Sequence, residues 1–168
     1  MAFARDFVDR WLAAWNSRNP DQLLSLCTDD IVWDDPALPE TVYGHEPVRE
    51  YLVSTWRGFP DLTFEIAGTP YVSRPENGAA LHWRVRGTML GPIDPPGLAP
   101  TGARVEGDGV DLYVFREGLL SEYVTRYDVA GWMRAMGLLP EPGSRTERVG
   151  VFFQRLGARK ARRRNAKA

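Results

Sequence analysis

Apolar and polar side chains alternate through residues 105–128, VEGDGVDLYVFREGLLSEYVTRYD, in the pattern of two β-strands. Side chains two residues apart share one face of a strand. Glu117-Gly118 is a turn signal between the two runs and therefore predicts a hairpin. The first strand has two distinct faces: Val110, Leu112 and Val114 on one, and Asp111, Tyr113 and Phe115 on the other.

Two carboxylates belong to this hairpin, Asp111 on the first strand and Asp128 at the end of the second. Burying an isolated carboxylate is costly, so an inward-pointing aspartate would be partnered or functional. The alternative is that one or both face water or pair with Arg126. On the second strand Tyr123, Thr125 and Tyr127 share one face, and Glu122, Val124, Arg126 and Asp128 share the other.

Helical periodicity marks three segments before residue 60. The first covers 3–16, with apolar residues four apart. Asn19-Pro20 supplies an N-cap and a first-turn proline for a second helix that ends near residue 27. The third helix runs over 46–57. Between the second and third helices, a short strand over 31–35 ends at Asp35-Pro36, where the aspartate is either an ordinary turn residue or a functional group.

The remainder predicts strands over 62–73 and 79–89, a Gly/Pro-rich loop over 91–102, the hairpin, and a last helix over 129–136. Helices followed by a run of strands indicate an α+β fold, in which helices cover one face of a mostly antiparallel sheet. The other face of the hairpin, with Val110, Leu112 and Val114, is apolar as well and has to be buried against something else. We therefore expect a homodimer.

Charge is unevenly distributed along the 168 residues, whose net charge is −1. Residues 155–168 hold seven Lys and Arg and no acid, which leaves 14 cations against 22 acids in 1–154. An acidic body is not expected to bind nucleic acid. A composition change at Pro140 predicts a domain over 1–139 followed by a linker and a basic, disordered tail over 140–168, with one or two helical turns over 149–156.

The sequence also predicts a cytoplasmic protein without a membrane span. Cys27 is the only cysteine, so no intramolecular disulfide can form. The charged N-terminus lacks the pattern of a secretory signal, and no apolar run approaches the length of a transmembrane helix.

Several segments, taken in order, resemble the SnoaL-like polyketide cyclase family of the nuclear transport factor 2-like superfamily, over about residues 3–139. They are WNSRNPDQLLSLCTDDIVWDDP, Gly44, FPDLTFE, WRVRGTMLG, APTGARVE and YVTRYDVAGWMRAMGL. The resemblance implies a curved sheet wrapped by helices into a cone around an apolar pocket. It also implies intramolecular aldol ring closure, with Asp128 at the position of the acid/base. The family's histidine on the preceding strand is missing here, where Asp111 and Tyr113 stand instead.

The chain is also similar to ketosteroid isomerase. That resemblance places the base at Asp35, before Pro36, and the protonated enolate partner at Asp111. The oxyanion tyrosine of the first helix falls on Trp11, whose indole N–H can still donate a hydrogen bond.

These features predict a small hydrophobic substrate, polyketide-like or polycyclic, and acid/base chemistry on it. Asp128 is the favoured acid/base, Asp35 the alternative base, and Asp111 the enolate partner or the residue that orients Arg126. No metal or other cofactor is expected, because His45 and His82 lie in unrelated contexts. Alternatives are an isomerase or a non-catalytic ligand-binding protein. The predicted substrate-binding side chains are Trp11, Trp15, Trp33, Trp56, Trp83, Tyr113 and Arg126.

Overall fold

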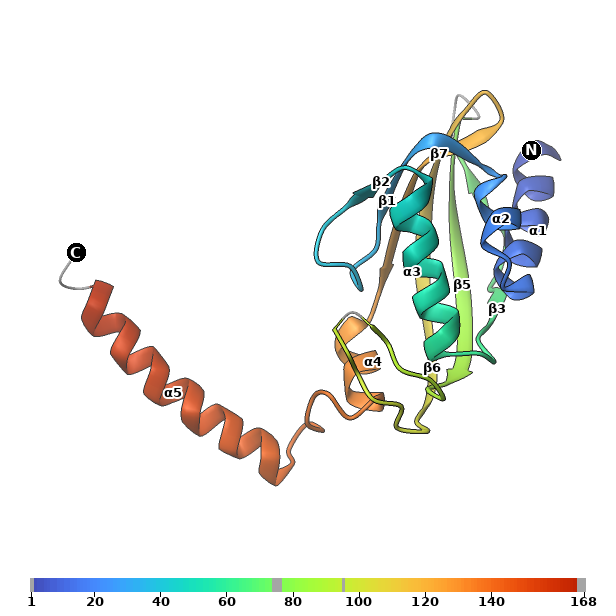
Figure 1. The fold of residues 1–168 in the computed structure, drawn as a ribbon. Coiled ribbons are helices and arrows are strands. Elements are labelled where there is room, and N and C mark those ends of the chain that lie inside the picture. The colour runs from blue at the N-terminus through green and yellow to red at the C-terminus, as the bar shows by residue number, and fades with distance from the viewer. Residues whose placement is uncertain (1, 74–76, 95, 166–168) are drawn as a thin grey trace.

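A computed structural model describes residues 2–73, 77–94 and 96–165. Within them, one curved sheet carries helices on one face, as expected for an α+β chain (Figure 1). The helices are α1 (Ala2–Ser17), α2 (Pro20–Leu24), α3 (His45–Gly58), α4 (Val129–Ala135) and α5 (Arg145–Asn165). The strands are β1 (Cys27–Asp34), β2 (Val42–Tyr43), β3 (Thr63–Ile66), β4 (Tyr71–Val72), β5 (Gly78–Thr88), β6 (Arg104–Arg116) and β7 (Leu119–Tyr127).

The strand order is β2-β1-β7-β6-β5-β3, and β4 pairs with β5. Only β1 and β7 run parallel among the described pairs, so the sheet is mostly antiparallel, as the sequence predicts. Local signals explain several boundaries. The Asn19 side chain accepts hydrogen bonds from the backbone of Asp21 and Gln22, which starts α2. Glu117 and Gly118 both have positive φ in the β6–β7 turn.

Two strand predictions need correction. The single strand expected over 62–73 is divided into β3 and β4, and the ladder with β5 is interrupted between Ala67, whose N–H donates to the His82 carbonyl oxygen, and Tyr71. The short strand β2, which pairs with β1, is not anticipated from its sequence. Two-residue strands carry too little periodicity to be recognised, because their only signal is tertiary pairing.

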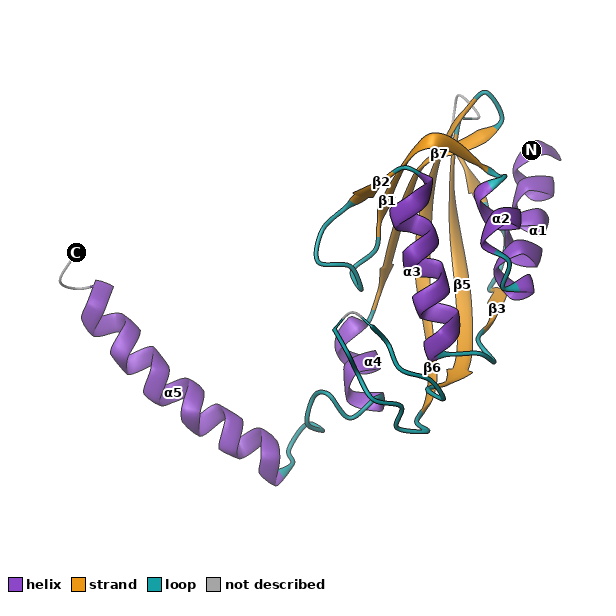
Figure 2. Cartoon of the chain, viewed as in Figure 1, coloured by secondary structure: helices purple, strands orange, loops and turns teal. Residues whose placement is uncertain are grey.

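The predicted faces of the hairpin are confirmed. Asp111, Tyr113 and Phe115 are buried beneath the helices, and Val110, Leu112 and Val114 are exposed on the outer face. Figure 2 shows α1, α2 and α3 on the covered side of the sheet, with α4 near one end of it. The inner face of β6 and β7 therefore packs beneath the helices and forms one side of the protein interior.

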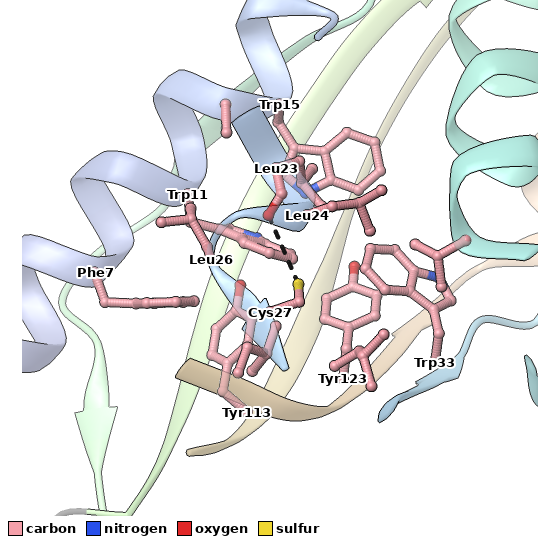
Figure 3. Close-up of a cluster of buried hydrophobic side chains, with 14 of the residues drawn as sticks. Phe7, Trp11, Trp15, Leu23, Leu24, Leu26, Cys27, Trp33, Tyr113 and Tyr123 are labelled. Atoms are coloured by element: carbon pink, nitrogen blue, oxygen red, sulfur yellow. Dashed lines mark hydrogen bonds between the residues drawn. The ribbon is translucent and has the colours of Figure 1, made fainter. Parts of the chain in front are cut away.

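An aromatic cluster fills the space between α1 and the inner face of β6 and β7 (Figure 3). Trp11 of α1 lies within 6.3 Å, centroid to centroid, of Phe7, Trp15, Trp33, Tyr113 and Tyr123. The closest pair is Trp33 of β1 and Tyr123 of β7, at 4.0 Å. Such rings bury large apolar areas and hold α1 on the sheet.

The helix of the C-terminal segment is longer than the one or two turns that the sequence predicts over 149–156. Residues 145–165 form the single helix α5, which points away from the rest of the molecule (Figure 1). Arg, Lys, Ala and Glu, all good helix formers, make up much of this segment, which explains why it is helical despite its charge. The division into a domain over 1–139 and a tail over 140–168 stays a prediction. None of the described helices is long and apolar enough to cross a membrane.

Gly109 makes room for a large side chain of the neighbouring strand. It lies opposite Trp83 in the β5–β6 register, and a Cβ at this position would come within 2.4 Å of the Trp83 ring and 2.7 Å of the Arg126 carbonyl oxygen. The Trp83 indole can cross β6 only because residue 109 has no side chain.

We therefore expect Gly109→Ala to lower the free energy of unfolding by about 1–3 kcal/mol, because the indole and the backbone must both shift. Urea denaturation measures this change. Gly150→Ala on α5 is the matched control, since a Cβ there meets no atom within 4 Å. An unchanged stability of Gly109→Ala would contradict the tight contact.

Candidate active site

A cavity of about 830 Å³ opens between the inner face of the sheet, α3, α4 and two loops. Its walls are predominantly apolar, with a few polar groups among aromatic and aliphatic side chains. This composition is typical of sites for small hydrophobic ligands. The segments that contribute are the end of α1, the 35–42 loop, α3, the 59–64 segment, residues 93, 94, 96 and 98 of the Gly/Pro-rich loop, the middle of β5, the second half of β7, and α4 with the residues after it. The main aromatic side chains on the walls are Trp15, Tyr51, Phe59, Phe64, Trp83, Tyr123, Tyr127 and Trp132.

Asp35 is the buried acid on the cavity wall. Its side chain is 6% exposed and accepts three hydrogen bonds. Tyr51 Oη donates to Oδ2 at 2.6 Å, Tyr127 Oη donates to Oδ1 at 3.0 Å, and the Ala37 backbone N–H donates to Oδ1 at 2.8 Å. The last bond is the turn interaction expected at Asp-Pro, so Asp35 shapes the turn and faces the cavity at once.

The surroundings of Asp35 make its carboxyl group less acidic than that of an ordinary aspartate. Burial raises the pKa of its carboxyl group, and the hydrogen bonds from Tyr51, Ala37 and Tyr127 oppose that rise. The pKa values of Tyr51 and Tyr127 are themselves raised, chiefly by burial and also by the charge of Asp35. Both tyrosines therefore remain protonated hydrogen-bond donors across the physiological pH range.

Asp111 lies deeper, behind the wall, and is 4% exposed. Its Oδ1 accepts hydrogen bonds from Trp83 Nε1 at 2.7 Å and from Tyr123 Oη at 3.1 Å, and its Oδ2 accepts one from Tyr113 Oη at 2.8 Å. Burial raises the pKa of Asp111 to about 6, against the opposing effect of the polar side chains around it. All three of these partners are donors, so the geometry fits an ionised carboxylate.

Asp111 is not among the described residues that line the cavity, but two of its hydrogen-bond partners are. Trp83 and Tyr123 both line the cavity, and both are held by Asp111 Oδ1. The sequence predicts Asp111 as a donor to an enolate or as the partner of Arg126. The structure places it among donors instead, and Arg126 forms its ion pair with Asp34 at 2.6 Å on the outer face.

Asp128 has a different position from the other two aspartates. The strand β7 ends at Tyr127, and Asp128 is the exposed N-cap of α4, where its Oδ1 accepts a hydrogen bond from the Gly131 backbone N–H at 2.8 Å. Asp128 is not among the described residues that line the cavity. Its acid/base role stays a prediction.

The predicted ligand-binding side chains divide between wall and core. Trp15 and Trp83 line the cavity, whereas the exposed Arg126 lies on the outer face. The remaining four are buried in the aromatic core and are absent from the described lining: Trp11, Trp33, Trp56 and Tyr113.

Two functional candidates, Tyr51 and Tyr127, are missing from the predicted set. Tyr127 could be found from the sequence, because it shares the inward face of its strand with Tyr123 and Thr125. Tyr51 lies on α3 beside the stripe formed by Val48 and Leu52, and only the fold brings it to Asp35.

No cluster of His, Cys, Asp or Glu suited to a metal ion occurs among residues 2–73, 77–94 and 96–165. The polar groups of the described lining include carboxylates, phenols and indoles, together with the Arg57 guanidinium and the hydroxyls of Ser54, Thr55 and Thr125. These groups can accept, donate and transfer protons.

Comparison with known proteins places this geometry in a family. The model of the SnoaL-like domain matches residues 8–123. The chain belongs to the SnoaL-like family. No curated protein sequence matches it.

Solved structures share the fold over most of their length. A proposed SnoaL-like polyketide cyclase from Jannaschia sp. CCS1 has 20% sequence identity and a TM-score of 0.71, over 83% of this chain and 94% of its own. AclR from Streptomyces galilaeus, a proposed hydroxylase, has 25% identity and a TM-score of 0.70, over 84% and 89%. A protein with a ketosteroid isomerase-like fold from Catenulispora acidiphila DSM 44928 has 20% identity and a TM-score of 0.65, over 79% and 93%. The expected nuclear transport factor 2-like cone is thereby confirmed.

Because Asp111 is buried and its pKa is raised, we expect the free energy of unfolding to depend on pH. Because the folded-state pKa is raised, the folded protein binds this proton more tightly than the unfolded chain does. The resulting stabilisation is full below the unfolded value of 3.8 and is lost as the pH rises to about 6. Relative to Asp111→Asn, the free energy of unfolding of the wild type should fall by on the order of 3 kcal/mol across this interval.

Urea unfolding of both proteins at a series of pH values measures the difference. The asparagine also replaces one acceptor oxygen by a donor, which adds an offset that does not depend on pH. A difference that stays constant from about pH 4 to about pH 6 would show that Asp111 is not buried as an ionisable group.

Proposed function

We propose that this SnoaL-like protein binds a small hydrophobic carbonyl compound in the cavity and removes a proton from the carbon next to the carbonyl, with Asp35 as the base. The observation that carries this proposal is the Asp35 carboxylate, buried on the wall of an apolar cavity and held by two tyrosine hydroxyls. The family and its polyketide cyclase and ketosteroid isomerase-like neighbours support a reaction of this class.

The proposed step transfers the substrate's α-proton to a carboxylate oxygen of Asp35, and the electron pair of the broken C–H bond moves into the enolate. A desolvated carboxylate is a stronger base than one in water, because burial disfavours its charged form. The described partners of Asp35 are neutral donors rather than a cation. A cation would lower the pKa of the carboxyl group and weaken the base.

The tyrosines provide a means to stabilise the enolate. Once Asp35 is protonated, its oxygen no longer needs two donors, and the hydroxyl of Tyr127 or Tyr51 is free to turn toward the negative oxygen of the substrate. Hydrogen bonds directed at developing charge in a water-poor site are a large source of catalysis. Tyr127 lines the cavity beside Trp83, with ring centroids 5.9 Å apart, and is the better placed against a bound ring system.

In the cyclase form of the reaction, the enolate carbon attacks a second carbonyl group of the same substrate. A carbon–carbon bond forms, the attacked carbonyl oxygen becomes an alkoxide, and the proton held by Asp35 is available to neutralise it. In the isomerase form, the same proton returns to a different carbon. The apolar walls favour a folded substrate and exclude water in either case.

Asp111 acts in this scheme as a positioning residue. Its Oδ1 holds the Trp83 indole and the Tyr123 hydroxyl, and both side chains form the wall opposite a bound ligand. A non-catalytic binding protein is the second candidate. It is favoured by the complete hydrogen bonding of Asp35 without a ligand, which three donors already satisfy.

Proton–deuterium exchange on a panel of cyclic ketones and polyketide-like β-dicarbonyls tests the reaction directly. We expect the wild type to catalyse exchange at the α-carbon and Asp35→Asn to be about 10²–10⁴-fold slower, because the amide cannot accept the proton. Tyr127→Phe should retain part of the activity. Asp9→Asn, which changes an exposed aspartate of α1, is the matched control.

Asp128→Asn decides between the two candidate bases in the same assay. Loss of exchange in this variant, with Asp35→Asn still active, would move the base to the N-cap of α4 and overturn the assignment to Asp35. Binding of the ketones with exchange at background in every protein would contradict enolisation and favour the binding protein.

The exposed face of β6 supports a second proposal, that two copies of the chain pair through the outer side of the sheet. Val110, Leu112 and Val114 form an apolar row there, and burial of such a row is a driving force for dimers. Light scattering should give about twice the chain mass of 18.9 kDa for the wild type and one chain mass for Leu112→Lys. Leu90→Lys, in an exposed loop position, is the control, and a monomeric wild type would contradict the dimer.

A further inference from the structure

The helix α5 has an exposed apolar stripe that no other part of the described chain covers. Its side chains recur at i, i+3, i+4 and i+7 and therefore share one side of the helix. Phe152 and Phe153 are 58% and 64% exposed, which is unusual for adjacent large aromatic residues. In Figure 1 the helix points away from the sheet and from α1–α4. The stripe consists of Val149, Phe152, Phe153 and Leu156.

The same segment carries a concentrated positive charge. Residues 155–168 contain seven Lys and Arg and no acid, whereas residues 1–154 have a net charge of −8. A helix that is strongly polar as a whole, yet has aromatic residues along one side and many cations, is typical of helices that lie in the interface of a membrane. Clusters of four to eight cations on such a helix favour anionic headgroups.

We propose that α5 binds the surface of an anionic phospholipid bilayer. The apolar stripe enters the boundary between headgroups and acyl chains, and the cations of the segment contact lipid phosphates. The helix spans about 30 Å and its cations are concentrated toward its C-terminal half, so most of the positive charge lies at the end that is farther along the chain from the acidic body.

The acidic face of a second copy fits the helix less well. On the outer face of the sheet several acids already have local partners: Asp30 pairs with Arg116, Asp34 pairs with Arg126, and Asp108 is hydrogen-bonded to His82. A helix that docked there would have to compete with two local ion pairs and one local hydrogen bond. RNA would neutralise the cations, but its phosphate backbone offers no apolar layer in which Val149 and Leu156 could be buried.

Flotation of the full-length protein with vesicles tests the proposal. Vesicles of phosphatidylcholine alone are compared with an equal mixture of phosphatidylcholine and phosphatidylglycerol. We expect binding to the mixture, weaker binding at higher salt, and a loss of at least about tenfold in partitioning for Phe152→Ser/Phe153→Ser. Val151→Ser is the matched control. Val151 is also exposed, but it lies on the opposite side of the helix, and the variant should bind within about twofold of the wild type.

Three results would overturn the proposal. The first is an absence of binding to the anionic vesicles. The second is binding that the double Phe variant leaves unchanged. The third is equal loss in Val151→Ser, which would show a general effect on the helix rather than insertion of the stripe. If vesicle binding is absent, a parallel titration with single-stranded RNA and a mass measurement show whether α5 serves nucleic acid or a second copy instead.

Discussion

The structure depends on the burial of carboxylates that are held only by neutral donors. Asp35 and Asp111 are both nearly inaccessible, and their partners are tyrosine hydroxyls, an indole N–H and a backbone N–H. Leaving a buried carboxylate without partners would cost several kcal/mol, and pairing it with Arg would suppress its basicity. Phenolic and indole donors stabilise the charge while leaving the group able to accept a proton.

This requirement explains features that are distant from the cavity. The Trp83 indole must cross β6 to reach Asp111, and Gly109 is the residue that allows it. The aromatic cluster around Trp11 fixes Tyr113 and Tyr123 from the other side, so that their hydroxyls meet the same carboxylate. The aromatic core thus orients the cavity-lining side chains Trp83 and Tyr123. Asp35, Tyr51 and Tyr127 line the same cavity.

Much of this arrangement can be predicted from the sequence, and the parts that cannot have identifiable physical reasons. Alternation along β6 predicts correctly that Asp111, Tyr113 and Phe115 face inward, because a period of two is a local property. The same rule extended by one residue assigns Asp128 to the strand, but the strand ends at Tyr127 and Asp128 caps the next helix. An aspartate between a strand and a helix satisfies both patterns, and only the backbone geometry distinguishes them. Tyr51 is 16 residues from Asp35, and its role arises from the packing of α3 on β1.

The proposed reaction requires Asp35 to be an ionisable base whose pKa is set by burial and by its tyrosine donors. Carbon-13 NMR of protein labelled at the aspartate side-chain carboxyls, with Asp35→Asn to identify the resonance, measures that pKa directly. We predict that Asp35 titrates above the ordinary value of an aspartate, and that Tyr127→Phe raises its pKa further because one stabilising donor is lost. An ordinary pKa that Tyr127→Phe leaves unchanged would contradict this claim.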